Sequence, residues 1–136
     1  FDQNGNATTI DKLPQGHTFW GYFTVKNLSD RALPNCVLSQ ILPSGWAIEN
    51  NRLNKDGLPP WTHRLKHSQA DYMDIRDDRV LWFFDLNAKQ EKQFIVKLNT
   101  ITAGQFLLPP TLSEAMYDHN YKTRTVAKPI QITDDI

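Results

Sequence analysis

Short runs of alternating apolar and polar residues recur along this chain, and turn-forming residues separate them. Successive side chains of a β-strand point to opposite faces of the sheet, so such alternation predicts strands. Residues 17–27 place Phe19 and Val25 on one face and Trp20 on the other. The Asn-Leu-Ser-Asp sequence at 27–30 supplies turn residues. We therefore expect a strand followed by a turn.

Residues 79–86 form the most apolar run. One set of alternate positions is apolar throughout and consists of Val80, Trp82, Phe84 and Leu86. The intervening positions include Leu81 and Phe83, so both faces of the run are apolar. Because this composition is typical of strands in sheets that are covered on both sides, we predict cover on both faces here.

Further strands are predicted at 37–42, 46–48, 94–98, 104–108 and 129–133. With the two runs above they make seven or more short strands, in a chain with eight prolines and six glycines. Short strands separated by turn residues are typical of β-sandwiches. We predict an all-β, antiparallel, immunoglobulin-like β-sandwich, with residues 1–136 forming a single domain.

The segment 51–69 interrupts this pattern, because it is polar and contains one glycine and two prolines. We expect a long connection between the two sheets, with at most a short helical turn. Leu58, Trp61 and Leu65 are the side chains expected to order it.

The charge balance argues against a nucleic-acid partner. Lys and Arg number 15, Asp and Glu also number 15, and the formal net charge is zero. The single cysteine, Cys36, cannot form an internal disulfide, which leaves the cellular compartment open. No apolar run approaches the ~20 residues of a membrane helix. Since the chain begins at Phe1 rather than at a methionine, we expect a fragment whose export signal lies upstream.

Four stretches, taken in order, form a specific series. They are Ile-Leu-Pro-Ser-Gly-Trp at 41–46, Asp-Tyr-Met-Asp-Ile-Arg-Asp-Asp-Arg-Val at 71–80, Ala-Gly-Gln-Phe-Leu-Leu-Pro-Pro at 103–110, and Glu-Ala-Met-Tyr-Asp at 114–118. The first is weak alone, because Leu-Pro-x-Gly occurs in many sandwich domains, whereas the second and fourth together are specific. The series resembles the C-terminal, macroglobulin-type domain of the bacterial alpha-2-macroglobulins.

This resemblance implies that the chain is one domain of a large protease trap. The trap would be periplasmic, on the cell surface or secreted. It would be either free or anchored to a membrane through the N-terminal part of the protein, which this chain does not contain. In the family, an attacking protease cuts a bait region. In many members a thioester of the form Cys-x-x-Gln, in a separate helical domain, then captures the protease. Here Ser39 stands three places after Cys36, so the thioester is not on this chain. The implied partners of this chain are the other domains of the same polypeptide, above all the thioester domain. Target proteases would be bound by the full-length protein. The resemblance implies no cofactor.

The resemblance also assigns a role to Met116 and Tyr117. A Met-Tyr pair in the loop before the last strand resembles the family's lock over the thioester, which keeps water from the bond. A flexible thioether and a large phenol suit such a plug. The alternative is that Met116 packs in the sandwich core and Tyr117 is a corner tyrosine that bonds to the main chain. In relatives without the thioester, the pair would be an interface remnant.

A dense cluster of charges lies between residues 71 and 79. It contains Asp71, Asp74, Arg76, Asp77, Asp78 and Arg79. Carboxylates at this density suggest calcium, but the spacing differs from the calcium-loop pattern and lacks its glycine. We expect a structural corner in which arginine forks tie a loop to the ends of strands.

Catalytic and metal-binding patterns are weak in this chain. His63 and His67 stand four residues apart, but a zinc site needs at least a third ligand. No serine lies in a Gly-x-Ser-x-Gly motif, and the position of Cys36 in an alternating run suggests a small buried residue. We expect a domain that is not an enzyme and that holds no metal.

The aromatic residues keep another function open. Trp20, Tyr22, Trp46 and Trp61 exceed what one core needs, and we expect the outward ones on the surface. Coplanar rings on one sheet face would favour a carbohydrate-binding or adhesion module of a secreted bacterial protein. Apolar surface around Met116 and Tyr117 would favour the inhibitor domain. If both features are absent, the domain would be a purely structural spacer.

Overall fold

The computed structural model describes residues 1–49 and 58–134, and for His119 the backbone alone. The strands in chain order are β1 (Lys12–Pro14), β2 (Thr18–Lys26), β3 (Leu33–Ile41), β4 (Trp46–Ile48), β5 (Tyr72–Ile75), β6 (Arg79–Leu86), β7 (Glu91–Thr100), β8 (Gly104–Leu108), β9 (Thr111–Ala115), β10 (Asp118–Arg124) and β11 (Lys128–Thr133). The predicted all-β class is confirmed. The described part of the chain contains no helix long and apolar enough to cross a bilayer.

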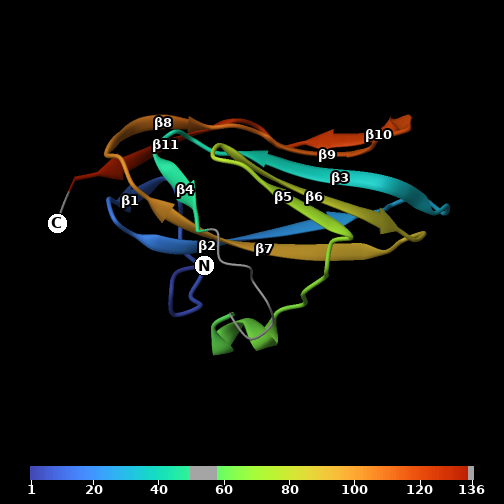
Figure 1. Ribbon diagram of the computed structural model, residues 1–136, viewed down its shortest axis with the longest axis horizontal. Helices are drawn as coiled ribbons and strands as arrows, with labels where there is room; N and C mark the ends of the chain where they lie inside the picture. The colour runs from blue at the N-terminus through green and yellow to red at the C-terminus, as the bar shows by residue number, and fades with distance from the viewer. Residues whose placement is uncertain (50–57, 135–136) are drawn as a thin grey trace.

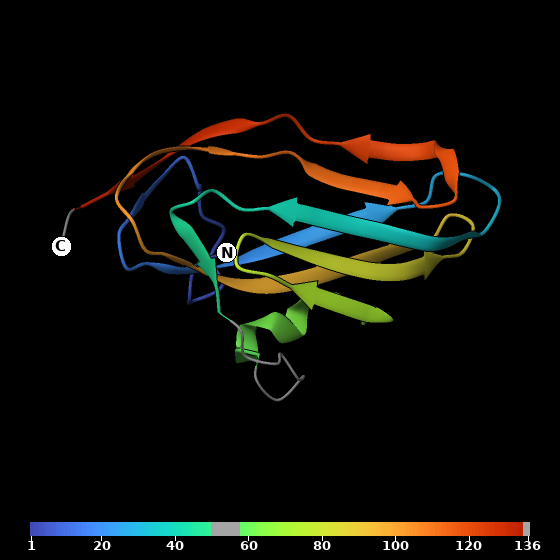
Figure 2. The ribbon, with the colours of Figure 1, turned by 45° about the horizontal axis from the view of Figure 1, so that its top comes forward.

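The strands pack as two layers around one core (Figure 1). One layer is a three-stranded sheet of order β2-β7-β4, and the other is a five-stranded sheet of order β10-β9-β3-β6-β5. A further three-stranded sheet, β1-β11-β8, continues the second layer at the end where the C-terminus lies. Figure 2 shows the strands of the five-stranded sheet side by side. All pairs are antiparallel except β1 with β11, so the predicted antiparallel sandwich is confirmed.

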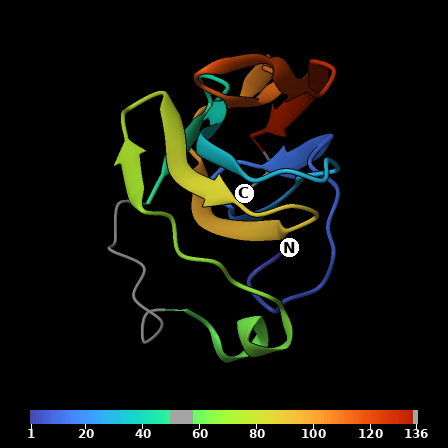
Figure 3. The ribbon, with the colours of Figure 1, turned by 90° about the vertical axis from the view of Figure 1, so that its right-hand side faces the viewer.

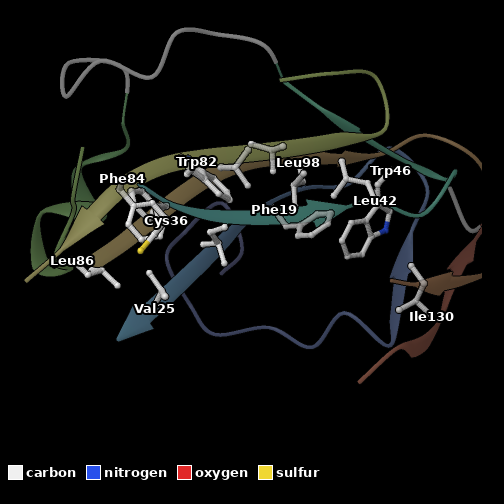
Figure 4. Packing of buried hydrophobic residues seen from close by; sticks show 14 of the residues in the cluster. Phe19, Val25, Cys36, Leu42, Trp46, Trp82, Phe84, Leu86, Leu98 and Ile130 are labelled. Atoms are coloured by element: carbon white, nitrogen blue, oxygen red, sulfur yellow. The ribbon is translucent and has the colours of Figure 1, made fainter. Parts of the chain in front are cut away.

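The core forms where the inward faces of β6 and β7 meet, as Figure 4 shows from close by. The alternate positions of β6 are all buried: Val80 is 0%, Trp82 3%, Phe84 1% and Leu86 3% exposed. The ring of Trp82 stacks on that of Phe94 in β7, with centroids 5.4 Å apart. Phe94 in turn meets Phe84 at 5.1 Å. Close-packed rings of this kind hold the two layers together.

The opposite face of β6 departs from the prediction. Leu81 and Phe83 are only half-buried, so cover on both faces is wrong for the described residues. The physical reason is the position of β6 in an outer layer: its inner face meets β7, and its other face points away from the sandwich.

The long connection carries the short helix that was expected. Residues 60–64 form a 3-10 helix, η2 (Pro60–Arg64), while 50–57 lie outside the described residues. Figure 3 shows η2 beside the N-terminal segment, on the outer side of the β2–β7 layer. Trp61 in η2 donates its indole N–H to the Gln3 carbonyl at 2.9 Å and packs edge-on against Trp20.

Two of the four aromatics that were counted as a surplus are buried. Trp46 is 6% exposed and packs in the core against Phe19, with ring centroids 4.9 Å apart. Trp20 is 4% exposed and packs against Trp61, because the chain covers the outer side of β2 with its own connection.

Gly45 explains the Leu-Pro-Ser-Gly-Trp motif. A β-carbon at this position would lie 2.6 Å from Ile132 Cδ1 and 2.7 Å from Phe106 Cε2, closer than real contacts allow. The Gly45 carbonyl also accepts a hydrogen bond from Ile101 N at 2.8 Å. Glycine is therefore required here for close packing of the loop before β4 against β8 and β11.

We predict that Gly45→Ala lowers the free energy of unfolding by about 1–3 kcal/mol, because a methyl group must displace packed side chains. Urea denaturation measures the change, and Ser44→Ala at the exposed neighbouring residue is the control. Equal stability of the two variants would contradict the close-packing account.

Candidate functional site

Met116 and Tyr117 form the two-residue turn of the β9–β10 hairpin. The turn is closed by the pair Ala115 and Asp118, and Ala115 is 5% exposed. The hairpin belongs to the outer end of the five-stranded sheet, with β10 at the edge and β9 paired to β3. The turn is therefore anchored by a buried residue on one side and an edge strand on the other.

A β-bulge in β3 holds the turn in place. The β3–β6 register shifts between Leu33 and Cys36, and Asn35 in the bulge has a positive φ of 56°. In this geometry the Asn35 carbonyl accepts a hydrogen bond from Met116 N at 2.9 Å. Asn35 N donates to Asp85 Oδ1 at 2.8 Å. Asn tolerates the left-handed region better than most residues, and bulges commonly re-aim neighbouring groups.

The β2–β3 connection supports the hairpin from the side. Arg31 pairs with the Asp118 carboxylate at 3.2 Å and lies over the ring of Tyr121 at 5.5 Å. The connection is shaped by Asn27, which is 2% exposed. The Asn27 amide donates to the carbonyl of Arg31 at 2.8 Å and to that of Asn87 at 3.0 Å.

The two residues of the turn differ in exposure. Tyr117 is 82% exposed, whereas Met116 is half-buried and lies outside the main core cluster. The corner-tyrosine interpretation is therefore wrong for Tyr117, and the core interpretation is wrong for Met116. Leu28, 74% exposed, borders the same end of the sandwich. Tyr117 and Leu28 thus both expose apolar surface at this end of the sandwich.

A groove of about 470 Å³ lies behind the hairpin. Its walls come from the end of β2, the β2–β3 connection and β9–β10, and Leu28, Ala115 and Tyr121 are among its lining residues. Cys36 lines it as well but is only 3% exposed. Burial raises the pKa of the Cys36 thiol, and the Asp85 carboxylate raises it further. Both effects disfavour the reactive thiolate.

The charge cluster lies in the β5–β6 turn. Arg79 forms a two-pronged contact with the Asp78 carboxylate, at 3.0 Å for each prong. This hydrogen bonding holds the pKa of Asp78 below its ordinary value. Arg76 contacts Asp74 in β5 at 3.1 Å, and the Asp78 carbonyl accepts a bond from Leu42 N at 2.8 Å. Asp71 and Asp77 are exposed.

The other candidate groups do not assemble. His67 contacts the Thr62 carbonyl at 2.6 Å, and His63 is exposed. Among residues 1–49 and 58–134, no three His, Cys, Asp or Glu side chains gather so as to hold a metal ion. Trp20 and Trp61 meet at 85°, so they form no coplanar platform.

The sequence predicted a loop at Met116 and Tyr117 but placed it before the last strand, which is wrong because the turn precedes β10 and β11 still follows. The sequence also did not predict the residues that support the turn. Asn35 and Asn27 carry the local signal of turn-forming residues, and Pro34 precedes Asn35. Nothing in the sequence pattern pairs Arg31 with Asp118, which lies 87 residues away.

Comparisons with known proteins relate this chain and its fold to one protein family. Residues 1–120 match the family described as the bacterial alpha-2-macroglobulin MG10 domain. The alpha-2-macroglobulin of Rickettsia conorii is 30% identical over 115 residues, which cover 83% of this chain and 6% of the relative. A crystal structure of a Salmonella alpha-2-macroglobulin mutant matches with a TM-score of 0.83 and 21% identity, over 97% of this chain and 9% of that one. Salmonella alpha-2-macroglobulin reacted with methylamine matches with a TM-score of 0.79 and 20% identity, over the same shares.

The fold is thus that of a macroglobulin β-sandwich. The chain belongs to the bacterial alpha-2-macroglobulin MG10 domain family, as its sequence motifs predicted. It spans only 6% of the length of the Rickettsia relative and 9% of the matched Salmonella chains.

We predict that Asn35→Ala lowers the free energy of unfolding by about 1 kcal/mol, because alanine is strained at positive φ. Asn35→Gly is the matched variant: it relieves this strain and should leave stability within about 0.5 kcal/mol of the wild type. The Asn35 side chain is exposed, so neither change empties the core. Urea denaturation distinguishes the two, and equal losses would contradict a role for the bulge backbone.

Proposed function

We propose that this chain is the non-catalytic, C-terminal macroglobulin domain of a bacterial protease trap. In this role its β9–β10 turn packs on the helical thioester domain and shields the thioester from water. The same contact takes part in the change from the closed to the activated state. The target proteases would meet the full-length protein, in the periplasm or at the cell surface, rather than this domain.

The exposure of Tyr117 carries this proposal. A tyrosine that is 82% exposed on a two-residue turn contributes little to its own domain. A large aromatic side chain in that position is suited to enter a pocket on a partner, where aromatics are enriched at the centre of interfaces. Met116 beside it is half-buried, so it can fill the gap between the turn and a partner.

The support beneath the turn favours a fixed plug over a mobile loop. The hydrogen bond from Met116 N to the Asn35 carbonyl and the Arg31–Asp118 pair hold both ends of the turn. A preorganised tip loses less conformational entropy on docking than a flexible one. Water exclusion is the chemical requirement, because a thioester is an acyl donor that water hydrolyses.

A non-catalytic role agrees with the chemistry of the described side chains. Cys36 is buried with a raised pKa, which disfavours nucleophilic attack. The carbohydrate alternative loses its main support, because Trp20 and Trp46 are buried and the Trp20 and Trp61 rings are nearly perpendicular.

The test uses the full-length polypeptide that contains this chain and measures the rate of methylamine incorporation. We predict that Tyr117→Ala raises the rate at least about tenfold, equivalent to about 1.4 kcal/mol of lost protection. Met116→Ala should raise it by a smaller factor, because Met116 is already half-buried in its own domain.

Val126→Ala is the matched control, since Val126 is 90% exposed but lies in the β10–β11 connection. Circular dichroism checks that each variant is folded. Rates for the Tyr117 and Met116 variants equal to the control would contradict the proposed plug. Absence of incorporation in every form, including after protease treatment, would contradict a thioester-shielding role.

A further inference from the structure

The outer side of the five-stranded sheet carries two complete cross-strand rows of side chains. Strand register aligns the first row as Tyr72, Phe83, Val37, Glu114 and Lys122. It aligns the second as Asp74, Leu81, Ser39, Leu112 and Arg124. These two rows are called the outer face below. Figure 2 looks onto this side, with β2 and β7 behind it.

Apolar side chains extend across the outer face from β5 to β9. Tyr72 is 63% and Leu112 42% exposed, while Leu81 and Phe83 are half-buried. The rings of Tyr72 and Phe83 lie 5.8 Å apart, and Val37, the cross-strand neighbour of Phe83 in β3, is 8% exposed. The water-facing side of an antiparallel sheet is ordinarily polar. Contiguous apolar residues there, rimmed by polar ones, mark an interaction surface.

The charges of the outer face lie in β5 at one edge and in the neighbouring strands β9 and β10 at the other. On the β5 edge, Asp74 is paired with Arg76. On the β10 side, Lys122 and Arg124 are both exposed, and the one carboxylate of the outer face beside them is Glu114 in β9, the cross-strand partner of Lys122. No carboxylate of the described residues forms a salt bridge with either cation. An apolar centre whose border carries two cations and one carboxylate, and so a net positive charge, is complementary to an apolar surface that carries a carboxylate.

We infer that the outer face is covered by another domain of the same polypeptide, which presents an apolar patch with a carboxylate opposite Lys122 and Arg124. This interface is separate from the Met116–Tyr117 turn and does not depend on a thioester. It accounts for Leu81 and Phe83, the two apolar residues among the four outward positions of β6.

The length of the relatives favours a domain of the same chain over a second copy. The matched Salmonella chains extend far beyond this region, which covers 9% of each. A tethered domain docks at a high effective concentration, so a small patch suffices. An independent dimer ordinarily buries about 800 Å² on each partner, whereas a tethered domain does not need so large an interface.

The experiment places single cysteines in the full-length polypeptide and measures their maleimide labelling rates by mass spectrometry of the peptides. Tyr72→Cys and Leu112→Cys report on the outer face, and Val126→Cys, at a 90% exposed residue, is the control. Each native rate is divided by the rate in denaturant to remove intrinsic differences between the sites. We expect this ratio to be at least about tenfold lower at the two face positions. Similar ratios at all three positions would overturn the inference.

Two further arms test the identity of the partner. If the cover is a domain of the same polypeptide, protection is independent of protein concentration, whereas loss of protection on dilution would indicate a second copy and overturn the assignment. Lys122→Glu combined with Arg124→Glu should raise labelling of Leu112→Cys severalfold. An unchanged rate would overturn the assigned carboxylate. Methylamine incorporation tests the role of the Tyr117 turn and does not depend on the outer face. Failure of the thioester-shielding proposal therefore leaves the outer-face proposal testable, and the reverse also holds.

Discussion

The pairing of β3 with strands on both its sides is the interaction on which the rest of the structure depends. On one side β3 binds β6, the strand whose inner face supplies the most deeply buried side chains. On its other side it binds β9, which carries the hairpin. The bulge at Asn35 contacts both neighbours of β3. Its backbone amide donates to Asp85 at the end of β6, and its carbonyl accepts from Met116 N at the end of β9. The exposed turn is thus connected to the core through β3 as well as through the buried Ala115 that closes it.

The two layers differ in whether the chain itself covers their outer sides. On the β2–β7 layer, η2 and the N-terminal segment cover the sheet, and Trp20 is buried beneath Trp61. On the five-stranded sheet no described segment does the same for Phe83 and Leu81, which stay half-exposed. The apolar outer side of the β2–β7 layer is therefore covered by the chain itself, and that of the five-stranded sheet is available for a partner. That asymmetry suits a domain that works as part of a larger polypeptide.

Much of the fold could be predicted from the sequence, because alternation over a buried strand is a strong signal. The predicted bounds of β6 and β4 match the structure, and β2 differs by one residue at each end. The signal fails for β1, β5, β9 and β10, which are short or contain many charged and hydroxyl side chains. Three of these, β1, β5 and β10, are sheet edges, where apolar alternation is weak. Likewise, the burial of Trp20 could not be predicted, because its partner Trp61 comes from a connection without periodicity.

For the candidate site, the sequence identified the turn residues but not the geometry that presents them. Met116 and Tyr117 were chosen through the family motif, whereas the exposure of Tyr117 and the bulge beneath the turn required coordinates. Residue spacing cannot reveal contacts such as that between Arg31 and Asp118, which form only when distant segments meet.

The central claim is that the Tyr117 turn rests on the reactive domain of its own polypeptide. The most direct measurement replaces Tyr117 by a photo-crosslinking amino acid in the full-length protein and identifies the linked peptide by mass spectrometry. The account predicts a link to the domain that contains the Cys-x-x-Gln motif, and its loss after protease cleavage of the bait region. A link only to other domains, or one that survives cleavage unchanged, would contradict it.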